Sequence, residues 1–406
     1  MTSVAFLAPY AAPATLRFVR AVAGTPGVRC GLITQEPLER LPADVRSGLA
    51  GHWRIDDALD PTQIAAATRS LENQIGPVER LVGILEQAQV AMAEARAMLG
   101  LPGMDAATAE NFRDKARMKS VLRDAGLPCA RHALVRSVDE AVAFAERTGF
   151  PLVVKPPAGA GARATYRVEN VADLRQGLAV SQPSPASPAL LEEFMTGREF
   201  SFDSVFVRGD LVWHSFCHYF PSPLEVMENP WIQWCVLLPR HIDDAAHERV
   251  RTVTTEAIRT LGLSTGMTHL EWFLRPGGDI ALSEVAARPP GAQFTSLISW
   301  AHDADFYKGW ADLVAHERFD PPPRRYAVAG VYLRGQGGAR VAAVHGLDAA
   351  QSEIGRLVVE SHLPRPGQPA SGTYEGDGYV ILRHEETEVV KQAARRLLDL
   401  VKVEMA

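Results

Sequence analysis

The chain has 406 residues, with 47% hydrophobic and 22% charged side chains and a formal net charge of −6 at pH 7. This length suits two or three domains better than one simple core. The negative net charge gives no general attraction to nucleic acid, and no apolar stretch is long enough to span a bilayer. We therefore expect a cytoplasmic protein with neither nucleic-acid nor membrane partners.

The cysteines lie far apart in the sequence and form no CxxC or Cys/His cluster. This spacing predicts free, buried thiols and argues against a zinc site or a disulfide framework. The residues concerned are Cys30, Cys129, Cys217 and Cys235.

The first hundred residues alternate between strand-like and helix-like stretches. Apolar runs stand at 4–8 and 28–34, and helical patterns at 15–23, 61–71 and 86–99. This alternation predicts a parallel, doubly wound sheet. No GxGxxG follows the first run, so the pattern gives no dinucleotide site. Because the segment 99–112 breaks the periodicity, we place this N-terminal α/β domain at 1–110.

A smaller unit is expected over 111–188. Its predicted elements are a helix over 111–127, a strand over 132–135, a helix over 138–148 and a strand over 151–155. Lys115 lies at the start of the first helix, and Lys119 is expected on its solvated face. The Pro- and Ser-rich stretch 180–189 then breaks the pattern.

The remainder, 189–406, is dominated by strand patterns. One helix is expected over 244–261, and an amphipathic helix over 388–402 ends the chain. The whole sequence therefore predicts a mixed α/β and α+β multidomain fold whose C-terminal domain contains an antiparallel sheet.

The sharpest chemical signal is a carboxylate pair on a predicted hairpin. Pro276-Gly277-Gly278-Asp279 is a turn signal between two β-type runs. A turn centred on the two glycines pairs Glu271 with Glu284, on one face of the hairpin. Like charges directly opposite destabilise a bare sheet, and Mg²⁺, which prefers hard oxygen ligands, would offset that repulsion.

The same predicted register sets His269 opposite Ala286 and Phe273 opposite Leu282. Arg288 follows the second strand, where a guanidinium could clamp a phosphate or carboxylate oxygen. A solvated hairpin face with incidental charges explains these residues equally well when they are taken alone. A turn shifted by one residue would put the two glutamates on opposite faces.

A strand ending in Lys155 precedes a loop of small residues, 158–165. Small residues let backbone N–H groups approach an anion, and a lysine at a strand end can reach nucleotide phosphates. A flexible hairpin tip is the alternative explanation. The loop residues that we assign to phosphate binding are Gly159, Gly161 and Ala162.

Residues 190–201 form an apolar run that ends in acids and turns into the next strand. Adenine recognition needs an apolar slot with a backbone donor and acceptor, and ribose hydroxyls suit a carboxylate. An exposed acidic hairpin remains the alternative. The residues that could serve the nucleotide are Glu192, Glu193, Phe194, Met195 and Glu199.

These pieces, in this order, resemble the ATP-grasp superfamily, over roughly 111–300. The motifs are "DKARMK…L..AGLP", "PLVVKP", "EEFMTGREF", "HLEWF" and "SEVAARPPG". The resemblance implies an N-terminal Rossmann-like domain, a small lid and a catalytic domain. It assigns ATP phosphates to Lys115 and Lys155, the acidic hinge position to Glu192, and adenine to the backbone of 193–195.

The resemblance further implies that Glu199 binds the ribose and that Glu271 and Glu284 bind Mg²⁺. It places Arg288 beside a carboxylate substrate, which attacks the γ-phosphorus and becomes an acyl phosphate, while the 113–188 unit closes as a lid. An amine then displaces phosphate. This gives an ADP-forming carboxylate–amine ligase that acts on small molecules, for which amino acids are the favoured substrates and a homodimer remains open.

The chain departs from the family pattern at Ala286, where a metal-binding Asn often stands. A second Mg²⁺ site is therefore expected to be weaker or differently built, and His269 is expected to be a core or supporting residue. The aromatic segment 218–234 could line the substrate pocket, form a dimer contact or plug the core. Two other functions remain open: activation of bicarbonate in a biotin-carboxylase-like or purine-pathway enzyme, and nucleotide binding without catalysis.

Overall fold

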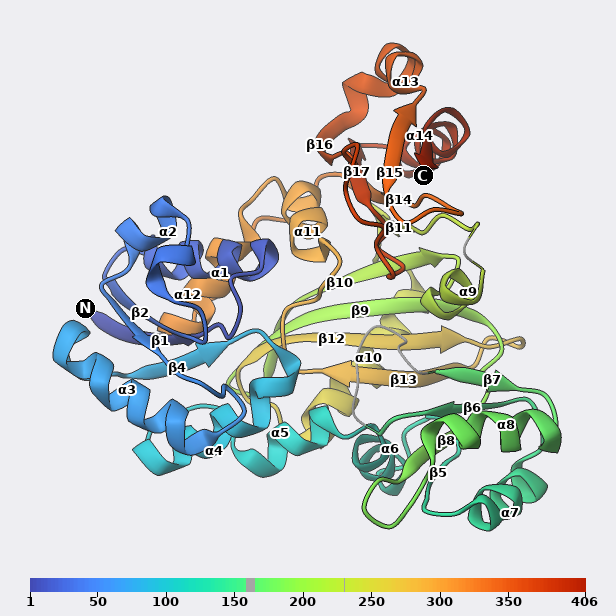
Figure 1. Ribbon diagram of the computed structural model, residues 1–406, viewed down its shortest axis with the longest axis horizontal. Helices are drawn as coiled ribbons and strands as arrows, with labels where there is room; N and C mark the ends of the chain where they lie inside the picture. Colours follow the sequence, from blue (N-terminus) through green and yellow to red (C-terminus); the bar gives the residue numbers. More distant parts are fainter. Residues whose placement is uncertain (158–164, 230) are drawn as a thin grey trace.

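The computed structural model describes residues 1–157, 165–229 and 231–406. Within these residues the chain forms an eight-stranded sheet, two four-stranded sheets and a two-stranded sheet. Figure 1 shows the eight-stranded sheet crossing the middle of the molecule, with the N-terminal sheet at one end of it and the small sheet below it. The mixed α/β and α+β class predicted from the sequence is confirmed.

The N-terminal region is the predicted doubly wound parallel sheet, with strand order β3-β2-β1-β4. Phe6 of the central strand packs against α1, while Leu7 packs against α3 and α4 on the other face. Its elements are β1 (Thr2–Leu7), α1 (Pro13–Ala23), β2 (Val28–Thr34), η1 (Leu38–Arg40), α2 (Ala43–Gly48), β3 (Gly51–Arg54), α3 (Pro61–Ile75), β4 (Arg80–Gly83), η2 (Glu86–Ala88) and α4 (Gln89–Leu99).

The small sheet has the order β5-β8-β6-β7 and packs against α7 and α8. The elements of this region are α5 (Ala106–Arg113), α6 (Lys115–Asp124), β5 (His132–Val135), α7 (Val138–Thr148), β6 (Leu152–Lys155), β7 (Tyr166–Val168), α8 (Val171–Ser181) and β8 (Ala189–Glu193). The sheet therefore reaches Glu193, and the domain limits at 110 and 188 remain predictions.

The helix predicted over 111–127 is interrupted at Asp114, and the segment 99–112 is not a plain break because it contains most of α5. The side chain of Asp114 accepts a hydrogen bond from the N–H of Arg117 (2.8 Å), which caps the first turn of α6. The cap fixes the start of α6 and therefore the position of the Lys115 side chain.

The rest of the chain builds the eight-stranded sheet, in the order β13-β12-β9-β10-β11-β14-β17-β16. The elements are β9 (Arg198–Val207), β10 (Asp210–Phe220), α9 (Pro223–Glu228), β11 (Cys235–Leu238), α10 (Ala245–Leu261), β12 (Gly266–Leu274), β13 (Ile280–Ala286), α11 (Phe294–His302), α12 (Phe306–His316), β14 (Ala327–Leu333), β15 (Val341–His345), α13 (Leu347–Ile354), η3 (Gly355–Leu357), β16 (Val358–His362), β17 (Gly378–His384), α14 (Thr387–Leu400) and β18 (Lys402–Met405).

The prediction of a single helix between Leu190 and the terminal helix was wrong, because α9, α11, α12 and α13 also form. The sequence of α11, FTSLISWAH, is rich in β-branched and aromatic residues and is buried on most sides. Such a segment lacks a polar stripe and cannot be told from a strand by periodicity.

The two faces of the eight-stranded sheet differ in what covers them. On one face, Phe202 and Leu270 pack with α10 in an apolar cluster. On the other face, Val205 and Met267 pack with residues of α11 and α12. Beyond these residues the second face turns polar. We call that part the acidic face, and it consists of Glu199, Ser201 and Asp203 of β9, His269 and Glu271 of β12, and Glu284 of β13.

Two expectations from composition can be compared with the described residues. The four cysteines are free, and all except the half-buried Cys129 are buried. Among the described helices, none combines the length and the apolar character needed to cross a bilayer.

Candidate functional site

The hairpin β12–β13 places Glu271 directly opposite Glu284, and His269 opposite Ala286, as predicted. The predicted pairing of Phe273 with Leu282 was wrong: Phe273 pairs with Ala281. The cause is two shifts of one residue that cancel at the glutamates.

The first shift is in the turn. The N–H of Arg275 donates to the carbonyl of Asp279 (2.8 Å), so three residues rather than two form the loop. Gly277 and Gly278 both have positive φ there, at 100° and 90°, a conformation that favours glycine. The second shift is a bulge at Ser283, which restores the register before Glu284. Without the bulge, Glu284 would lie on the opposite face.

Each glutamate of the pair has a cationic neighbour. Lys115 Nζ lies 2.5 Å from Glu284 Oε1, and His269 Nε2 lies 3.8 Å from Glu271 Oε1. Burial alone would raise the pKa of Glu284, but the charges of Lys115 and Lys155 outweigh it and lower that pKa to about 2. Glu284 is therefore held as a carboxylate, and the side chains of Glu284 and Glu271 both keep about a quarter of their surface exposed.

Behind this pair, the buried carboxylate of Glu192 joins the buried Lys119 and the largely buried Lys155. Glu192 lies 2.9 Å from Lys155 Nζ and 3.5 Å from Lys119 Nζ. The expectation that Lys119 is solvated was wrong, because its side chain is fully buried and donates to the carbonyl of Ser283. Burial lowers the pKa of Lys119, whereas the charges of Glu192 and Glu284 overcome burial and raise the pKa of Lys155.

The small-residue loop begins at the same place. Its preceding residue, Pro157, accepts a hydrogen bond from the N–H of Lys115 (2.9 Å), which ties the loop entrance to the start of α6. The assigned phosphate-binding residues Gly159, Gly161 and Ala162 lie outside the described residues. Lys115 and Lys155 thus lie on either side of the entrance to that loop.

The segment after β8 offers the expected apolar slot and a backbone donor. The N–H of Phe194 is used, donating to the carbonyl of Pro151 (3.1 Å), but that of Met195 has no backbone acceptor among the described residues. Met195 packs with Ala130, Ala281 and the partly exposed Phe273. The guanidinium of Arg167 lies 4.2 Å from the centre of the Phe194 ring, and Glu193 pairs with Arg131 at 2.7 Å.

Glu199 lies at the end of the acidic face and has no ion pair or hydrogen bond among the described residues. It is half-buried and sits opposite Phe273 in the sheet register. Burial and the charge of Glu271 raise the pKa of Glu199 well above its usual value. An acceptor is therefore present beside the apolar slot, and no residue within 1–157, 165–229 or 231–406 pairs with it.

Arg288 is held against the N-terminal region by Glu86 of η2. Its Nη2 lies 2.9 Å from Glu86 Oε2, and Arg113 Nη1 lies 3.1 Å from Oε1 of the same carboxylate. One buried acid therefore orients two guanidinium groups at the junction of three regions of the chain. Arg288 has the rigid support that recognition of a planar anion needs, and no pattern in the sequence pointed to the role of Glu86.

His269 is the supporting residue that the sequence analysis expected. Its Nδ1 lies 2.7 Å from the fully buried carboxylate of Asp203, and its Nε2 lies 3.4 Å from the Tyr219 hydroxyl. Burial favours the neutral ring, but the charge of Asp203 prevails and raises the pKa of His269 to about 9.

The aromatic segment 218–234 includes the end of β10 and the helix α9. Trp234 is buried and packs with Tyr332 and Tyr374 at ring-centre distances of 4.8 and 4.7 Å. Trp231, in contrast, is 62% exposed. The segment therefore supplies part of the core and two exposed aromatic side chains, Phe220 and Trp231.

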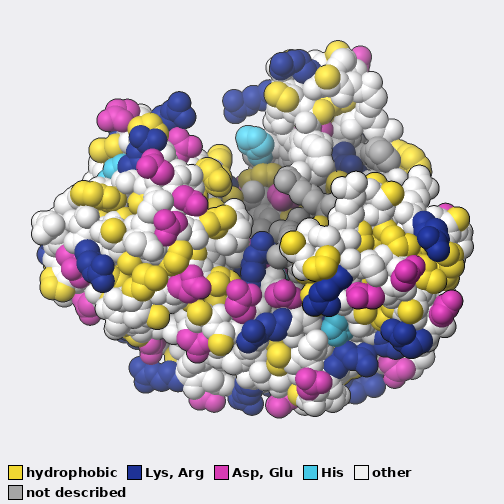
Figure 2. All heavy atoms as spheres, turned by 60° about the horizontal axis from the view of Figure 1, so that its bottom comes forward, with side chains coloured by type: hydrophobic (Ala, Val, Ile, Leu, Met, Phe, Trp, Pro, Cys, Tyr) yellow, Lys and Arg dark blue, Asp and Glu magenta, His cyan; other side chains and the backbone are white. Residues whose placement is uncertain are grey.

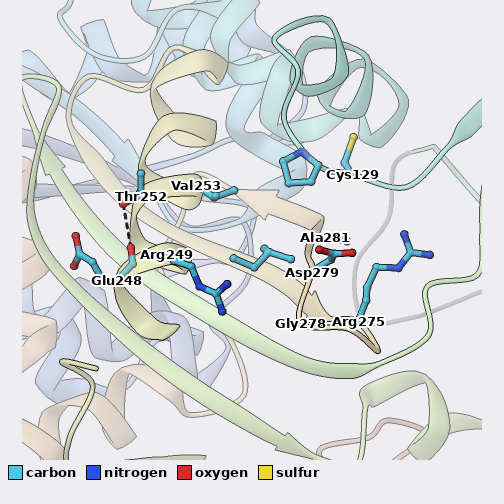
Figure 3. A pocket seen from close by; sticks show the side chains of 11 residues that line it. Cys129, Glu248, Arg249, Thr252, Val253, Arg275, Gly278, Asp279 and Ala281 are labelled. Carbon is cyan, nitrogen blue, oxygen red and sulfur yellow. Dashed lines mark hydrogen bonds between the residues drawn. The ribbon is translucent and has the colours of Figure 1, made fainter. Parts of the chain in front are cut away.

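Figure 2 shows the surface hollowed between the N-terminal lobe and the C-terminal elements, with Lys or Arg and His side chains at its walls. A separate cavity of about 690 Å³ lies between α10 and the edge of β13. Its lining includes Cys129, Arg249 and Arg275 (Figure 3), and it contains none of the assigned nucleotide or metal residues. We therefore assign the functional site to the cleft at the acidic face.

Comparison with known proteins bears on the family and the fold of the chain. Residues 120–299 match the family model of the ATP-grasp domain. The chain is 24% identical over 261 residues to an L-arginine-specific L-amino acid ligase of Bacillus subtilis, an alignment that spans 62% of each chain. The chain thus matches less than two thirds of that relative's length.

Solved structures show the same fold over the whole chain. The L-amino acid ligase of Bacillus licheniformis aligns with a TM-score of 0.80 and 18% identity, covering 100% of this chain and 99% of its own. The N5-carboxyaminoimidazole ribonucleotide synthetase of Thermotoga maritima aligns with a TM-score of 0.74 and 17% identity, covering 100% of both chains. These likenesses establish the fold.

Proposed function

Because this chain belongs to the ATP-grasp superfamily, we propose that it is an ATP-dependent ligase that joins a carboxylate to an amine through an acyl phosphate. The observation that carries the proposal is the carboxylate pair of Glu271 and Glu284, which faces the lysines Lys115 and Lys155. Paired acids bind a cation, and the lysines beside them bind an anion. Together they form a site for a metal ion with a polyphosphate rather than for a metal ion or an anion alone.

In this proposal the nucleotide base lies in the slot between Met195 and Phe273. The N–H of Met195 supplies a donor to the adenine edge, and Glu199 accepts from the ribose hydroxyls; neither group has a hydrogen-bond partner in the part of the chain that the structure describes. Lys115 and Lys155 then meet the phosphates together with the loop that contains Gly159, Gly161 and Ala162. When ATP is bound, the ammonium group of Lys115 exchanges its ion pair with Glu284 for a contact with phosphate.

The donor set of the pair fits Mg²⁺. Two carboxylates face each other across one hairpin, each partly open to the cleft, and these are hard oxygen ligands. When bound there, Mg²⁺ would offset the charge of the β- and γ-phosphates. Ala286 adds no ligand, and the His269 ring is hydrogen-bonded to Asp203. The carboxylate ligands of this chain therefore favour one strong Mg²⁺ site.

The chain's other residues position the reactants. Arg288, fixed by Glu86, holds the substrate carboxylate and the transferred phosphoryl oxygens. The carboxylate oxygen attacks the γ-phosphorus and ADP leaves. An amine then attacks the acyl carbon, phosphate leaves with the C–O bond electrons, and the amine loses its proton. Because an acyl phosphate hydrolyses in water, closure of the small sheet and its helices over the cleft would protect it.

Amino acids are the proposed substrates, supported by the whole-chain fold match to an L-amino acid ligase and by the sequence match to another. The match to a purine-pathway synthetase at a TM-score of 0.74 supports a second candidate, in which bicarbonate is the carboxylate that is activated.

A phosphate-release screen separates these functions. The protein is incubated with Mg-ATP and pairs of amino acids, and separately with bicarbonate and aminoimidazole ribonucleotide. Release that requires two amino acids supports the proposal, and release that requires bicarbonate supports the second candidate. ATP binding without release under any condition would leave only a nucleotide-binding protein.

A further inference from the structure

The cavity between α10 and the edge of β13 (Figure 3) has no part in the proposed reaction. It lies on the side of the eight-stranded sheet where α10 packs with Phe202 and Leu270, opposite the acidic face. Its volume of about 690 Å³ falls in the range of small-molecule sites. The charges and the apolar surface of its lining indicate which molecule it suits.

Two arginines of the lining keep donors available. Arg249 of α10 has neither a hydrogen bond nor an ion pair among the described residues. Arg275, directly after β12, lies 3.8 Å from Glu193, whose carboxylate has a closer partner in Arg131 at 2.7 Å. In Figure 3, Arg249 extends from α10 toward the hairpin turn, and Arg275 extends from that turn toward Cys129. Both guanidinium groups can therefore donate to an anion in the cavity.

The acidic side chains of the lining limit the charge of that anion. Glu248 is neutralised by Arg251, one helical turn further on, whose Nε lies 2.8 Å from its carboxylate. The side chain of Asp279 has no hydrogen bond or ion pair in the described part of the chain, and Figure 3 shows its carboxylate between Arg249 and Arg275. Two available positive charges and one negative charge favour a singly charged carboxylate over a phosphate dianion.

The rest of the lining is largely apolar. Val253, Ile280 and Cys129 are half-buried and pack against the apolar cluster beneath α10. Pro128 and Ala281 complete this surface. Guanidinium groups beside an apolar wall suit a carboxylate that has an apolar body.

The apolar wall also borders the proposed nucleotide slot. Ala281 lines the cavity and packs with Met195 and Ala130 in one small cluster. Pro128, another lining residue, accepts a hydrogen bond from the N–H of Leu282 (2.7 Å), which ties the segment before β5 to β13. A ligand in the cavity therefore contacts the two short segments that hold Met195 in place.

We propose that this cavity binds a small monocarboxylate with an apolar body, and that its occupancy changes the affinity of the cleft for nucleotide. Arg249 and Arg275 meet the carboxylate, and Val253 and Ile280 contact the apolar body. Binding in the cavity is independent of the proposed function. The effect on nucleotide rests on that function, because the slot beside Met195 is assigned there.

The test measures binding by calorimetry, with and without Mg-ADP, and needs no turnover. The probes are 3-phenylpropionate, its uncharged amide and phenyl phosphate. Arg249→Gln removes one guanidinium group on the side of the sheet away from the cleft, and no hydrogen bond or ion pair among the described residues is lost with it. Arg395→Gln, at an exposed position of α14 outside the cavity lining, is the matched control.

Loss of a charged hydrogen bond should weaken 3-phenylpropionate binding about tenfold or more in Arg249→Gln, and the amide should bind the wild type correspondingly more weakly. Arg395→Gln should keep the wild-type affinity. Absence of binding at millimolar 3-phenylpropionate, or equal affinity in wild type and Arg249→Gln, overturns the inference. A wild-type dimer that Arg249→Gln dissociates, detected by sedimentation, also overturns it, because a second copy then covers the cavity. Tighter binding of phenyl phosphate overturns the choice of a monocarboxylate.

The link to the cleft has its own readout. Bound 3-phenylpropionate should change the affinity for Mg-ADP about fivefold or more, and Mg-ADP should change the affinity for the probe by the same factor. Probe binding with unchanged Mg-ADP affinity contradicts the link through Ala281. Probe binding that depends on Arg249, in a protein that binds no Mg-ADP, contradicts the proposed function and leaves the carboxylate site standing.

Discussion

Replacing Glu192 by Gln tests how the cleft is held together before nucleotide binds. Glu192 is 3% exposed and is the common partner of Lys155, at 2.9 Å, and the fully buried Lys119, at 3.5 Å. The amide keeps the shape of the side chain but removes its charge, so two buried ammonium groups lose their shared counter-ion.

The expected cost follows from burial. Breaking a buried ion pair by removing one partner costs about 3–5 kcal/mol, because the remaining charge stays desolvated. For a cooperative unit of 150–250 residues, about 1 kcal/mol shifts Tm by about 2–4 °C, so a fall of about 6–20 °C is expected. Urea denaturation followed by tryptophan fluorescence, together with thermal unfolding, measures both quantities without nucleotide.

The neighbouring residue provides the control. Glu193 pairs with Arg131, whose side chain is 51% exposed, and more distantly with Arg275. Such solvent-screened pairs contribute about 0–1 kcal/mol, so Glu193→Gln should change Tm by a few degrees at most. If Glu192→Gln costs no more than Glu193→Gln, the buried Lys119–Glu192–Lys155 arrangement does not exist in solution as described.

Three further substitutions test the assigned roles. Glu284→Ala should leave the protein folded but lower kcat by about 100-fold or more, because it removes half of the proposed metal site; wild-type turnover would defeat that assignment. Lys155→Ala should weaken ATP binding about tenfold or more by calorimetry, since it removes a buried cation from the phosphate site, and unchanged affinity would count against the lysine's role. Glu199→Gln should raise Tm at pH 8 and weaken ATP binding. The folded pKa of Glu199 lies well above its unfolded value, so its contribution to stability is present below the unfolded pKa and is lost as pH rises through the folded one. Tm values of variant and wild type should therefore converge near pH 4, and a constant difference across pH would refute this sign.

The pairing of Glu271 with Glu284 shows how much of the site the sequence could predict. It also shows that this prediction was correct only because two errors in the register cancelled. The strand pattern and the glycines placed Glu271 opposite Glu284, and the structure agrees. The assumed two-residue turn was wrong, and only the bulge at Ser283 restored the pairing. A bulge depends on local strand twist and packing rather than on a residue signature, so periodicity alone could not have shown it.

Residues that act through distant partners were the ones missed. Lys119 has the spacing of an ordinary exposed lysine on α6, and its burial arises only when Glu192 and Ser283 are brought against it. Glu86 lies 202 positions before Arg288 in the chain. Such contacts are set by tertiary packing, and no local pattern encodes them. For Lys119 alone, its place as the second lysine of the "DKARMK" motif was an available signal of a role beyond a solvated surface.

The helix α11 was missed for a different reason. Its sequence is apolar around most of the helix because it is buried on most sides, and a helix buried on most sides carries no clear amphipathic period. In α12, by contrast, Phe306, Trp310 and Leu313 are buried at helical spacing while Lys308 is exposed, so an amphipathic period was available in the sequence. The doubly wound N-terminal sheet, whose helices keep one polar side, was predicted correctly.

Isotope transfer tests the central claim most directly. The amino acid whose carboxylate is activated is labelled with ¹⁸O in that group and incubated with Mg-ATP, its amine partner and the wild-type protein. If the carboxylate attacks the γ-phosphorus in the cleft between Glu271, Glu284 and Lys155, each released phosphate carries one ¹⁸O atom. Amide formation with unlabelled phosphate would contradict the acyl phosphate, and with it the account of the site.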